Sequence, residues 1–238
     1  MIKRNSVSLM GIISVLLIIS LSVSSASAMS SQTNNISHTT KICFGKPSKN
    51  SDWSNCDVRY MDLTNLDLSG INLSGANLQG MRLYNVNLAG ANLSGANLQY
   101  ANLNFANLSG ANLQGANLKH IDFYHANLSY ANMQDVTFQG SRFPTVNLQG
   151  ANLVGSDFSN TDTELCNFQN ANLQHATFYQ TQMTGDDFSG ADLRNAHLVN
   201  SNFGGGASLA GANLEGANVA GLNTASADLS CYGNSICQ

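Results

Sequence analysis

One tripeptide, Ala-Asn-Leu, recurs eleven times in this chain of 238 residues, and ten of the copies begin at positions ending in 1 or 6. The resulting period of five residues is neither the period of 2 of a β-strand nor the period of 3.6 of an α-helix. A fixed internal repeat is typical of chains that build one structural unit many times over. The repeat therefore has to be explained before any other motif is interpreted.

The five-residue register is unbroken from Ser51 to Gly205, slips by one residue within 204–206 and then resumes as far as Cys231. The middle residue of each unit is usually Leu or Phe, the residue two before it is small or aliphatic, and the last two are polar or glycine. The two apolar side chains of every unit can face one common axis only if the chain turns a corner in each unit. Glycine at the last position tolerates the positive φ that such a corner needs. Stacked coils then bury a common apolar column, as in other solenoids.

The tandem phrase A-[ND]-L-x-x over residues 51–231 resembles the pentapeptide-repeat family. The resemblance implies an all-β fold, a right-handed quadrilateral parallel β-helix with four units in each coil. It also implies about nine coils at the spacing of neighbouring strands, ~4.8 Å. Middle phenylalanines that lie twenty residues apart are then expected to stack in three columns: Phe138 with Phe158 and Phe178, Phe123 with Phe143, and Phe168 with Phe188.

The first residues have the pattern of a secretory signal peptide. Lys3 and Arg4 precede an apolar stretch from Leu9 to Val23, and small residues follow as far as Ala28. We expect cleavage after Ala28. The alternative is an uncleaved anchor, although this stretch is short for a membrane span of ~20 residues. The predicted organisation is a signal peptide at 1–28, a flexible leader and N-terminal cap at 29–50, the β-helix at 51–231 and a C-terminal cap at 232–238.

The net charge of the mature chain and its glycosylation sequons indicate where the protein is located. Without Lys3 and Arg4 the mature chain has 8 basic and 14 acidic side chains, which argues against direct nucleic-acid binding. Four Asn-x-Ser sequons lie inside the tightly spaced repeat, where glycans would crowd one another: Asn72, Asn92, Asn107 and Asn127. We therefore predict an exported protein of the bacterial periplasm or exterior, with no membrane span after cleavage. The resemblance also allows the thylakoid lumen in a photosynthetic host.

The cysteines mark the two ends of the repeat. Cys43 and Cys56 flank its first units, and Cys231 and Cys237 flank its last. In a compartment that permits disulfides, each pair is expected to close a short cap. Cys166 stands alone in the slot that alanine usually fills, so we expect a small buried hydrophobe, the alternative being a reactive thiol.

Two other residues do not match the pattern of the repeat. Thr163 is a poor middle residue, and Asp186 is an acid in an inward slot. The preferred interpretation of Asp186 is a local bulge that carries it outward, and the alternative is a functional buried acid.

No catalytic motif is found in the sequence: it has no glycine-rich phosphate loop, no His-x-x-x-His pair and no Gly-x-Ser-x-Gly elbow. On a twenty-residue coil His120, His125 and His175 fall on different sides and do not converge on a metal. We therefore predict a protein that is not an enzyme and that has no metal or other cofactor.

Aromatic residues between 100 and 130 stand where the repeat normally carries small or polar residues. Outward aromatics resemble the anchors that dominate interfaces, which predicts a docking patch of Tyr100, Phe105, His120, Tyr124, His125 and Tyr130. The alternative is that the rings only stabilise adjacent coils, as cross-strand pairs do.

Two functions are compatible with these observations. The first is an exported scaffold, a monomer or end-to-end homodimer, that binds an unknown protein or envelope partner. The second comes from the resemblance, because some members of the family mimic duplex DNA and bind DNA gyrase. The more acidic part of the chain favours the second: Asp157, Asp162, Glu164, Asp186, Asp187 and Asp192.

Overall fold

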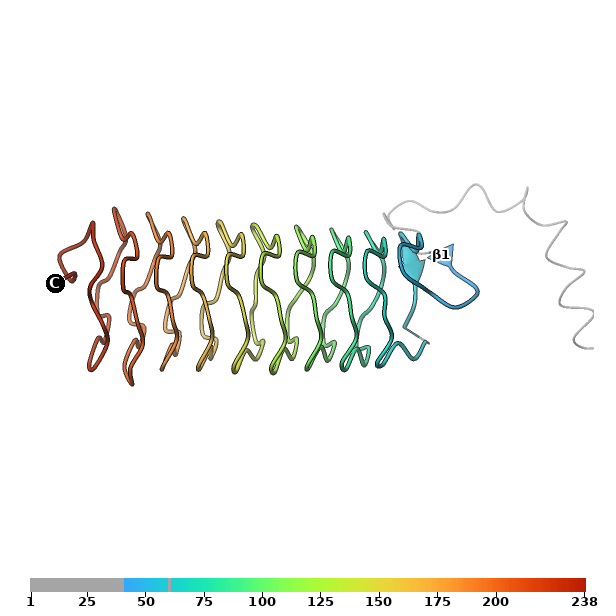
Figure 1. Ribbon diagram of the computed structural model, residues 1–238, viewed down its shortest axis with the longest axis horizontal. Helices are drawn as coiled ribbons and strands as arrows, with labels where there is room; N and C mark the ends of the chain where they lie inside the picture. The colour runs from blue at the N-terminus through green and yellow to red at the C-terminus, as the bar shows by residue number, and fades with distance from the viewer. Residues whose placement is uncertain (1–40, 60) are drawn as a thin grey trace, which may run out of the picture. The chain divides into compact units, whose positions relative to one another are not determined.

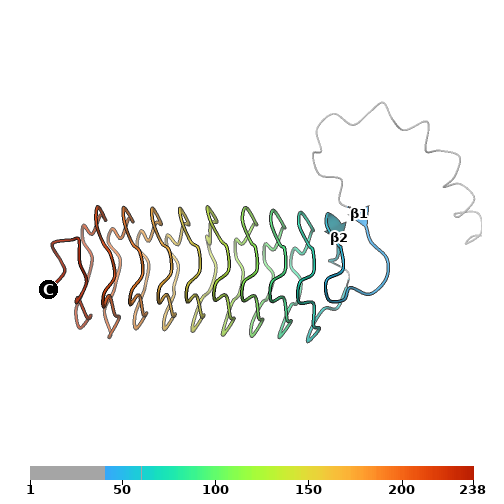
Figure 2. The ribbon, with the colours of Figure 1, turned by 45° about the horizontal axis from the view of Figure 1, so that its top comes forward.

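The repeat forms a β solenoid in which each coil lies against the coil before it. The computed structural model describes residues 41–59 and 61–238, and these residues form coils stacked along one axis (Figure 1). Two short strands, β1 (Lys41–Ile42) and β2 (Cys56–Asp57), pair in parallel at the N-terminal end (Figure 2). The predicted signal peptide, 1–28, and residues 29–40 of the predicted leader lie outside the described residues.

Parallel bridges beyond these strands give the period of the coil. Asp52 pairs with Asn72, Asn72 with Asn92, and the same separation of twenty residues recurs on four sides of the solenoid. The separation becomes 21 for Asp187 with Ser208 and stays so until Asn202 with Asn223. The extra residue of the glycine run at 204–206 is thus taken up within a single coil.

Each unit turns its corner through a backbone hydrogen bond. The N–H of Ile71 donates to the carbonyl oxygen of Leu68 at 3.1 Å, and the residue before Ile71, Gly70, has a φ of +68°. A positive φ at the third residue of a four-residue turn is the signature of type II. The N–H of Leu68 in turn donates to the carbonyl oxygen of Asn87 in the next coil at 2.7 Å. Turn and ladder alternate in this way, which explains the glycine or asparagine at the fifth position of so many units.

The middle residues form the core. Leu and Phe at these positions are almost fully buried from Leu63 to Leu214, and each such side chain contributes about 1.5–3 kcal/mol. The three expected phenylalanine columns are present. Ring centroids lie 4.5 Å apart for Phe138–Phe158, 4.9 Å for Phe158–Phe178, 5.2 Å for Phe123–Phe143 and 4.5 Å for Phe168–Phe188.

Asparagine side chains link the coils on the outside of the core. Asn107 Nδ2 donates to Asn87 Oδ1 at 3.0 Å, and Asn127 Nδ2 donates to Asn107 Oδ1 at 3.3 Å. The same Oδ1 of Asn107 accepts the backbone N–H of Ser109. One side chain therefore serves both its own turn and the contact between coils, which explains why the position before the middle residue is so often Asn.

The two ends of the solenoid are closed to different degrees. The structure contains both disulfides, Cys43–Cys56 and Cys231–Cys237. At the N-terminal end Trp53 and Val58 are buried. At the other end Val219, Leu222 and Leu229, the inward residues of the last coil, are only partly buried. Residues 232–238 therefore cover the last coil less completely than the cap predicted from the sequence.

Candidate interaction surface

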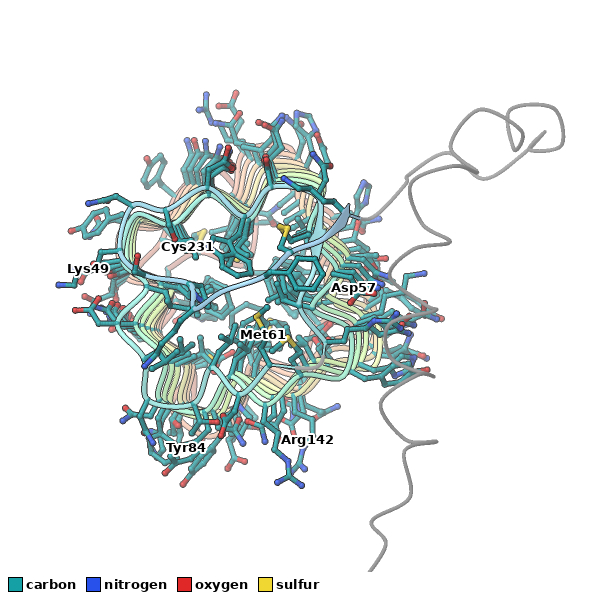
Figure 3. The ribbon with its side chains drawn as sticks, turned by 90° about the vertical axis from the view of Figure 1, so that its right-hand side faces the viewer. Lys49, Asp57, Met61, Tyr84, Arg142 and Cys231 are labelled. Atoms are coloured by element: carbon teal, nitrogen blue, oxygen red, sulfur yellow. A yellow bond between two sulfur atoms is a disulfide. The ribbon has the colours of Figure 1, made fainter. Side chains whose placement is uncertain are left out.

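The fifth residue of each unit lies at a corner of the coil, and five of the six predicted aromatic residues stand at this position. Phe105 has a φ of +61°, His125 of +56° and Tyr130 of +58°. This left-handed region is uncommon for residues other than glycine and asparagine. The backbone turn thus directs these side chains outward at a conformational cost. Figure 3, which looks along the stack, shows Tyr84 and Arg142 on the outside and Met61 toward the interior.

One corner gathers four aromatic rings, which we name the Phe105 cluster: Tyr84, Phe105, Tyr124 and His125. The centroid of Phe105 lies 5.3 Å from that of Tyr84, 5.5 Å from that of Tyr124 and 5.4 Å from that of His125. Phe105 is 42% exposed and Tyr84 44% exposed, so the cluster presents apolar surface to solvent. His125 Nδ1 lies 2.8 Å from Thr145 Oγ1 of the next coil, a contact that orients the imidazole ring.

A second pair of rings occupies the preceding corner. Tyr100 and His120 stack with centroids 5.0 Å apart and an interplanar angle of 9°. The His120 ring extends over Gly140, where an added Cβ would lie 2.3 Å from Nδ1. Gly140, one coil after His120, therefore leaves room for the histidine ring.

Tyr130 lies on a third corner. It is 68% exposed, and its ring lies over Gly150, where an added Cβ would be 2.5 Å from Tyr130 Cε1. The six residues predicted as one docking patch are therefore distributed over three corners, because each step of five residues moves to the next corner of the coil. The role of these six residues as a docking patch stays a prediction.

Tyr84 belongs to the Phe105 cluster although it was not among the predicted residues. The signal was present in the sequence, since Tyr84 is the fourth residue of its unit and Phe105 is the fifth residue of the unit one coil later. Tyr84 lies before residue 100, where the predicted patch begins.

One polar atom beneath this corner is unsatisfied. Asn104 lies between Tyr84 and Tyr124 in the column of fourth residues, and its Nδ2 donates to Asp122 Oδ2 at 3.2 Å. Its Oδ1 is buried and has no hydrogen-bond partner in the part of the chain that the structure describes. A buried polar atom without a partner costs about 1–3 kcal/mol, so a second local cost lies next to the Phe105 cluster.

The interior contains one polar cluster. Asp186 is fully buried, its Oδ2 forms a hydrogen bond with Thr163 Oγ1 at 2.6 Å, and its Oδ1 accepts the backbone N–H of Cys166 at 2.8 Å. Burial raises the pKa of the Asp186 carboxyl well above its usual range. The predicted outward bulge at Asp186 was wrong, because two hydrogen bonds hold the acid in the inward slot. Its neighbour Asp187 is partly exposed.

Cys166 is a buried free cysteine. Its Sγ lies 2.8 Å from the carbonyl oxygen of Phe143, and burial raises the pKa of the thiol well above its usual range. A thiol with a raised pKa forms little of the reactive thiolate. The geometry therefore agrees with a buried side chain and not with a reactive one.

Neither a metal centre nor a membrane helix is found in residues 41–59 and 61–238. No three His, Cys, Asp or Glu side chains of these segments are grouped as a metal site requires. The same segments contain no helix with the length and apolar character of a membrane span.

Comparisons with known proteins place the chain in a family. Residues 49–80, 82–115 and 106–143 match the family of pentapeptide repeats, in eight copies, and residues 131–206 match the pentapeptide repeat region. No curated protein gives a significant match.

Several solved structures are similar to this chain. One is HetL, a pentapeptide repeat protein involved in heterocyst differentiation regulation in the cyanobacterium Nostoc, with 26% identity over 76% of this chain and 84% of that one, and a TM-score of 0.36. Another is QnrB1, a plasmid-mediated fluoroquinolone resistance protein, with 15% identity, 76% and 90% coverage and a TM-score of 0.41. A third comes from the Arabidopsis thaliana thylakoid lumen, with 27% identity, 48% and 66% coverage and a TM-score of 0.26. The family matches together span most of the solenoid, and the chain belongs to the pentapeptide repeat family.

Proposed function

We propose that this protein is a non-enzymatic, exported scaffold whose Phe105 cluster binds a protein or envelope partner. We take the scaffold to be a right-handed quadrilateral parallel β-helix of about nine coils. Parallel bridges between residues twenty apart support this form, because twenty residues correspond to four units and four corners.

The observation that carries the proposal is the group of exposed rings at the Phe105 cluster, which includes residues in a backbone conformation that aromatic residues disfavour. Positive φ costs a residue other than glycine about 1–2 kcal/mol, and both Phe105 and His125 adopt it. Earlier coils place Asn65 and Asn85 in the same column, where asparagine tolerates this conformation. The four ring contacts of the cluster return about 0.2–1 kcal/mol each, a total of the same order as this cost. The rings therefore bring little net stability, and exposed aromatic anchors are typical of binding surfaces.

The test removes aromatic rings of the Phe105 cluster and keeps the backbone turn at the corner. Phe105→Asn restores the residue type of the earlier coils, and combining it with Tyr124→Ser removes the two central rings. We expect the melting temperature to stay unchanged or rise, and capture of envelope components by immobilised protein to be lost. Tyr130→Gly, on another corner, is the matched control and should leave capture intact. A lower melting temperature with undiminished capture would show that the rings are structural.

Export is supported by the two disulfides, because disulfides persist in oxidising compartments. The predicted signal peptide at residues 1–28 adds to this support. Cell fractionation, with mass spectrometry of the N-terminus, is expected to find a mature chain that starts at Met29 outside the cytoplasm. A cytoplasmic pool with Met1 retained would contradict export.

The second candidate is a DNA mimic that modulates gyrase, which the acidic stretch from Asp157 to Asp192 favours. Two observations weaken it. Asp186 is inside the core, and Asp192 forms an ion pair with Arg194 at 2.6 Å. Inhibition of supercoiling by purified gyrase would support this candidate, and capture of an envelope component without such inhibition would support the first.

A further inference from the structure

The polar cluster of Thr163, Cys166 and Asp186 joins two coils through the core. Cys166 and Asp186 are twenty residues apart and stack in one inward column, where Ala106 and Ala126 stand three and two coils before Cys166. Thr163 is the buried middle residue of the unit before Cys166. The Asp186 side chain thus reaches from its own coil to the coil before it.

The hydrogen-bond inventory favours a neutral carboxyl. Asp186 Oδ1 accepts the N–H of Cys166 at 2.8 Å, while Asp186 Oδ2 lies 2.6 Å from Thr163 Oγ1. Thr163 Oγ1 also lies 3.1 Å from the carbonyl oxygen of Gln182. A hydroxyl has a single hydrogen. Both contacts of Thr163 are satisfied together only if the carboxyl supplies a hydrogen to Oγ1 and the threonine donates its own to Gln182.

The surroundings of Asp186 do not compensate a negative charge. The charged groups that act on it from the preceding coil are Asp162 and Glu164, which are both acidic and raise the pKa of its carboxyl further. The next coil presents Ala207 and Ser208, which carry no charge, and the N–H of Ser208 donates to the Asp186 main-chain oxygen at 2.9 Å. An ionised Asp186 would thus be a buried charge without a counter-ion, which is costly.

We call the contact of Asp186 with the coil of Thr163 and Cys166 the joint. It lies next to the point where the number of residues per coil changes. The bridge separation changes from 20 to 21 residues immediately after Asp186. The hydrogen bond from Gly185 N–H to Gly204 is long at 3.4 Å. One backbone contact next to the buried acid is therefore long, so the side-chain contacts have more to contribute there.

We propose that Asp186 is a proton-dependent latch: its neutral carboxyl holds its coil to the coil of Thr163 and Cys166, and loss of the proton opens the joint between them. The sign follows from a folded-state pKa that lies above the unfolded one. The contribution of the latch is complete below the unfolded value, about 3.9 for Asp. It declines as the pH rises from there to the folded-state pKa.

Cys166 provides a reporter inside the joint, because the other four cysteines form disulfides. The experiment measures the rate at which a thiol reagent labels Cys166 in the full mature protein under non-reducing conditions, between about pH 5 and about pH 9. Each rate is divided by that of the denatured chain at the same pH, which removes the change in thiolate fraction. The quotient gives the protection of Cys166 by the closed joint.

We expect protection in the wild type to fall by about tenfold per pH unit over the interval between the two pKa values. Asp186→Asn keeps the shape and cannot ionise, and Asp186→Ala restores the common residue of this slot, so protection should be independent of pH in both variants. Asp187→Asn, next in sequence and partly exposed, should follow the wild type.

Two results would overturn the latch. One is the same pH profile for the wild type and for both Asp186 variants, which would show that this carboxyl does not control the joint. The other concerns Thr163→Val, which keeps the shape and removes the hydroxyl, and which is expected to lower protection at every pH in the interval. Unchanged protection of Cys166 in Thr163→Val would show that the contact between Thr163 and Asp186 does not hold the two coils together.

Discussion

At the scale of single residues, the fifth position of each unit decides how much a corner costs. Glycine and asparagine accept the positive φ, whereas Tyr100, Phe105 and Tyr130 adopt it against their preference. Glycine also makes room for a large neighbour in the coil before it. Gly140 accommodates His120, and Gly150 accommodates Tyr130. The rings and the glycines of a column are thus paired.

This pairing predicts different effects of one substitution at two glycines. Gly95 and Gly150 both have a φ of +64°, but an added Cβ would meet nothing within 4 Å at Gly95 and would lie 2.5 Å from Tyr130 Cε1 at Gly150. Gly95→Ala should lower the free energy of unfolding by about 1–2 kcal/mol, and Gly150→Ala by more. Urea denaturation measures both. Adding Tyr130→Gly to Gly150→Ala should remove the difference between the two losses. Equal losses in Gly95→Ala and Gly150→Ala would contradict the pairing of rings with glycines.

The sequence alone identified the unusual residues of the core but not their contact. Thr163, Cys166 and Asp186 each departed from the repeat and were each interpreted separately. Their contact depends on a coil of twenty residues and on a threonine rotamer that turns its hydroxyl toward the next coil, and a five-residue pattern specifies neither. The outward bulge was a reasonable expectation for an isolated acid, and it was wrong because the acid is not isolated.

At the scale of the element, one coil is held to the next by backbone bridges and by the asparagine ladder. Each ladder runs in one direction, with Nδ2 of the later coil donating to Oδ1 of the earlier one. The column of Asn87 begins at Asp67, which accepts the bond from Asn87 at 3.0 Å. An aspartate is suited to this first place, since there it only has to accept. The four sequon asparagines use the nitrogen that a glycan would occupy.

The ladder predicts the effect of truncating one link. Asn107→Ala removes the bond to Asn87, the bond from Asn127 and the acceptor of its own turn. We expect a loss of about 1–3 kcal/mol in the free energy of unfolding. Gln114→Ala, at an exposed fourth position, is the matched control and should change stability by less than about 0.5 kcal/mol. Asn107→Asp keeps the turn acceptor and loses only the donor, so it should fall between the two.

At the scale of the whole solenoid, the two ends differ in how well they close the core. The period of five, with the twenty-residue coil that the resemblance implied, was sufficient to predict the stack of coils and the phenylalanine columns. It could not predict the quality of the caps, because residues 41–50 and 232–238 lie outside the repeat and fold by their own contacts. The structure has the N-terminal strand pair over a buried Trp53 at one end, and partly exposed Leu222 and Leu229 at the other.

This asymmetry predicts the order in which the solenoid opens. In repeat proteins each coil is stabilised by its neighbours, so the end with the least buried core frays first. Hydrogen exchange should be fastest in residues 213–232, and protection should rise toward the centre of the stack. Replacing Cys231 and Cys237 by serine should speed exchange in this last coil while leaving Cys56 and Val58 as protected as before. Replacing Cys43 and Cys56 should instead expose the first coil, whose core is buried in the intact protein. Faster exchange at the N-terminal end of the wild type would contradict this order and would mean that the bonds of the cap, and not the burial of the core, set the stability of the ends.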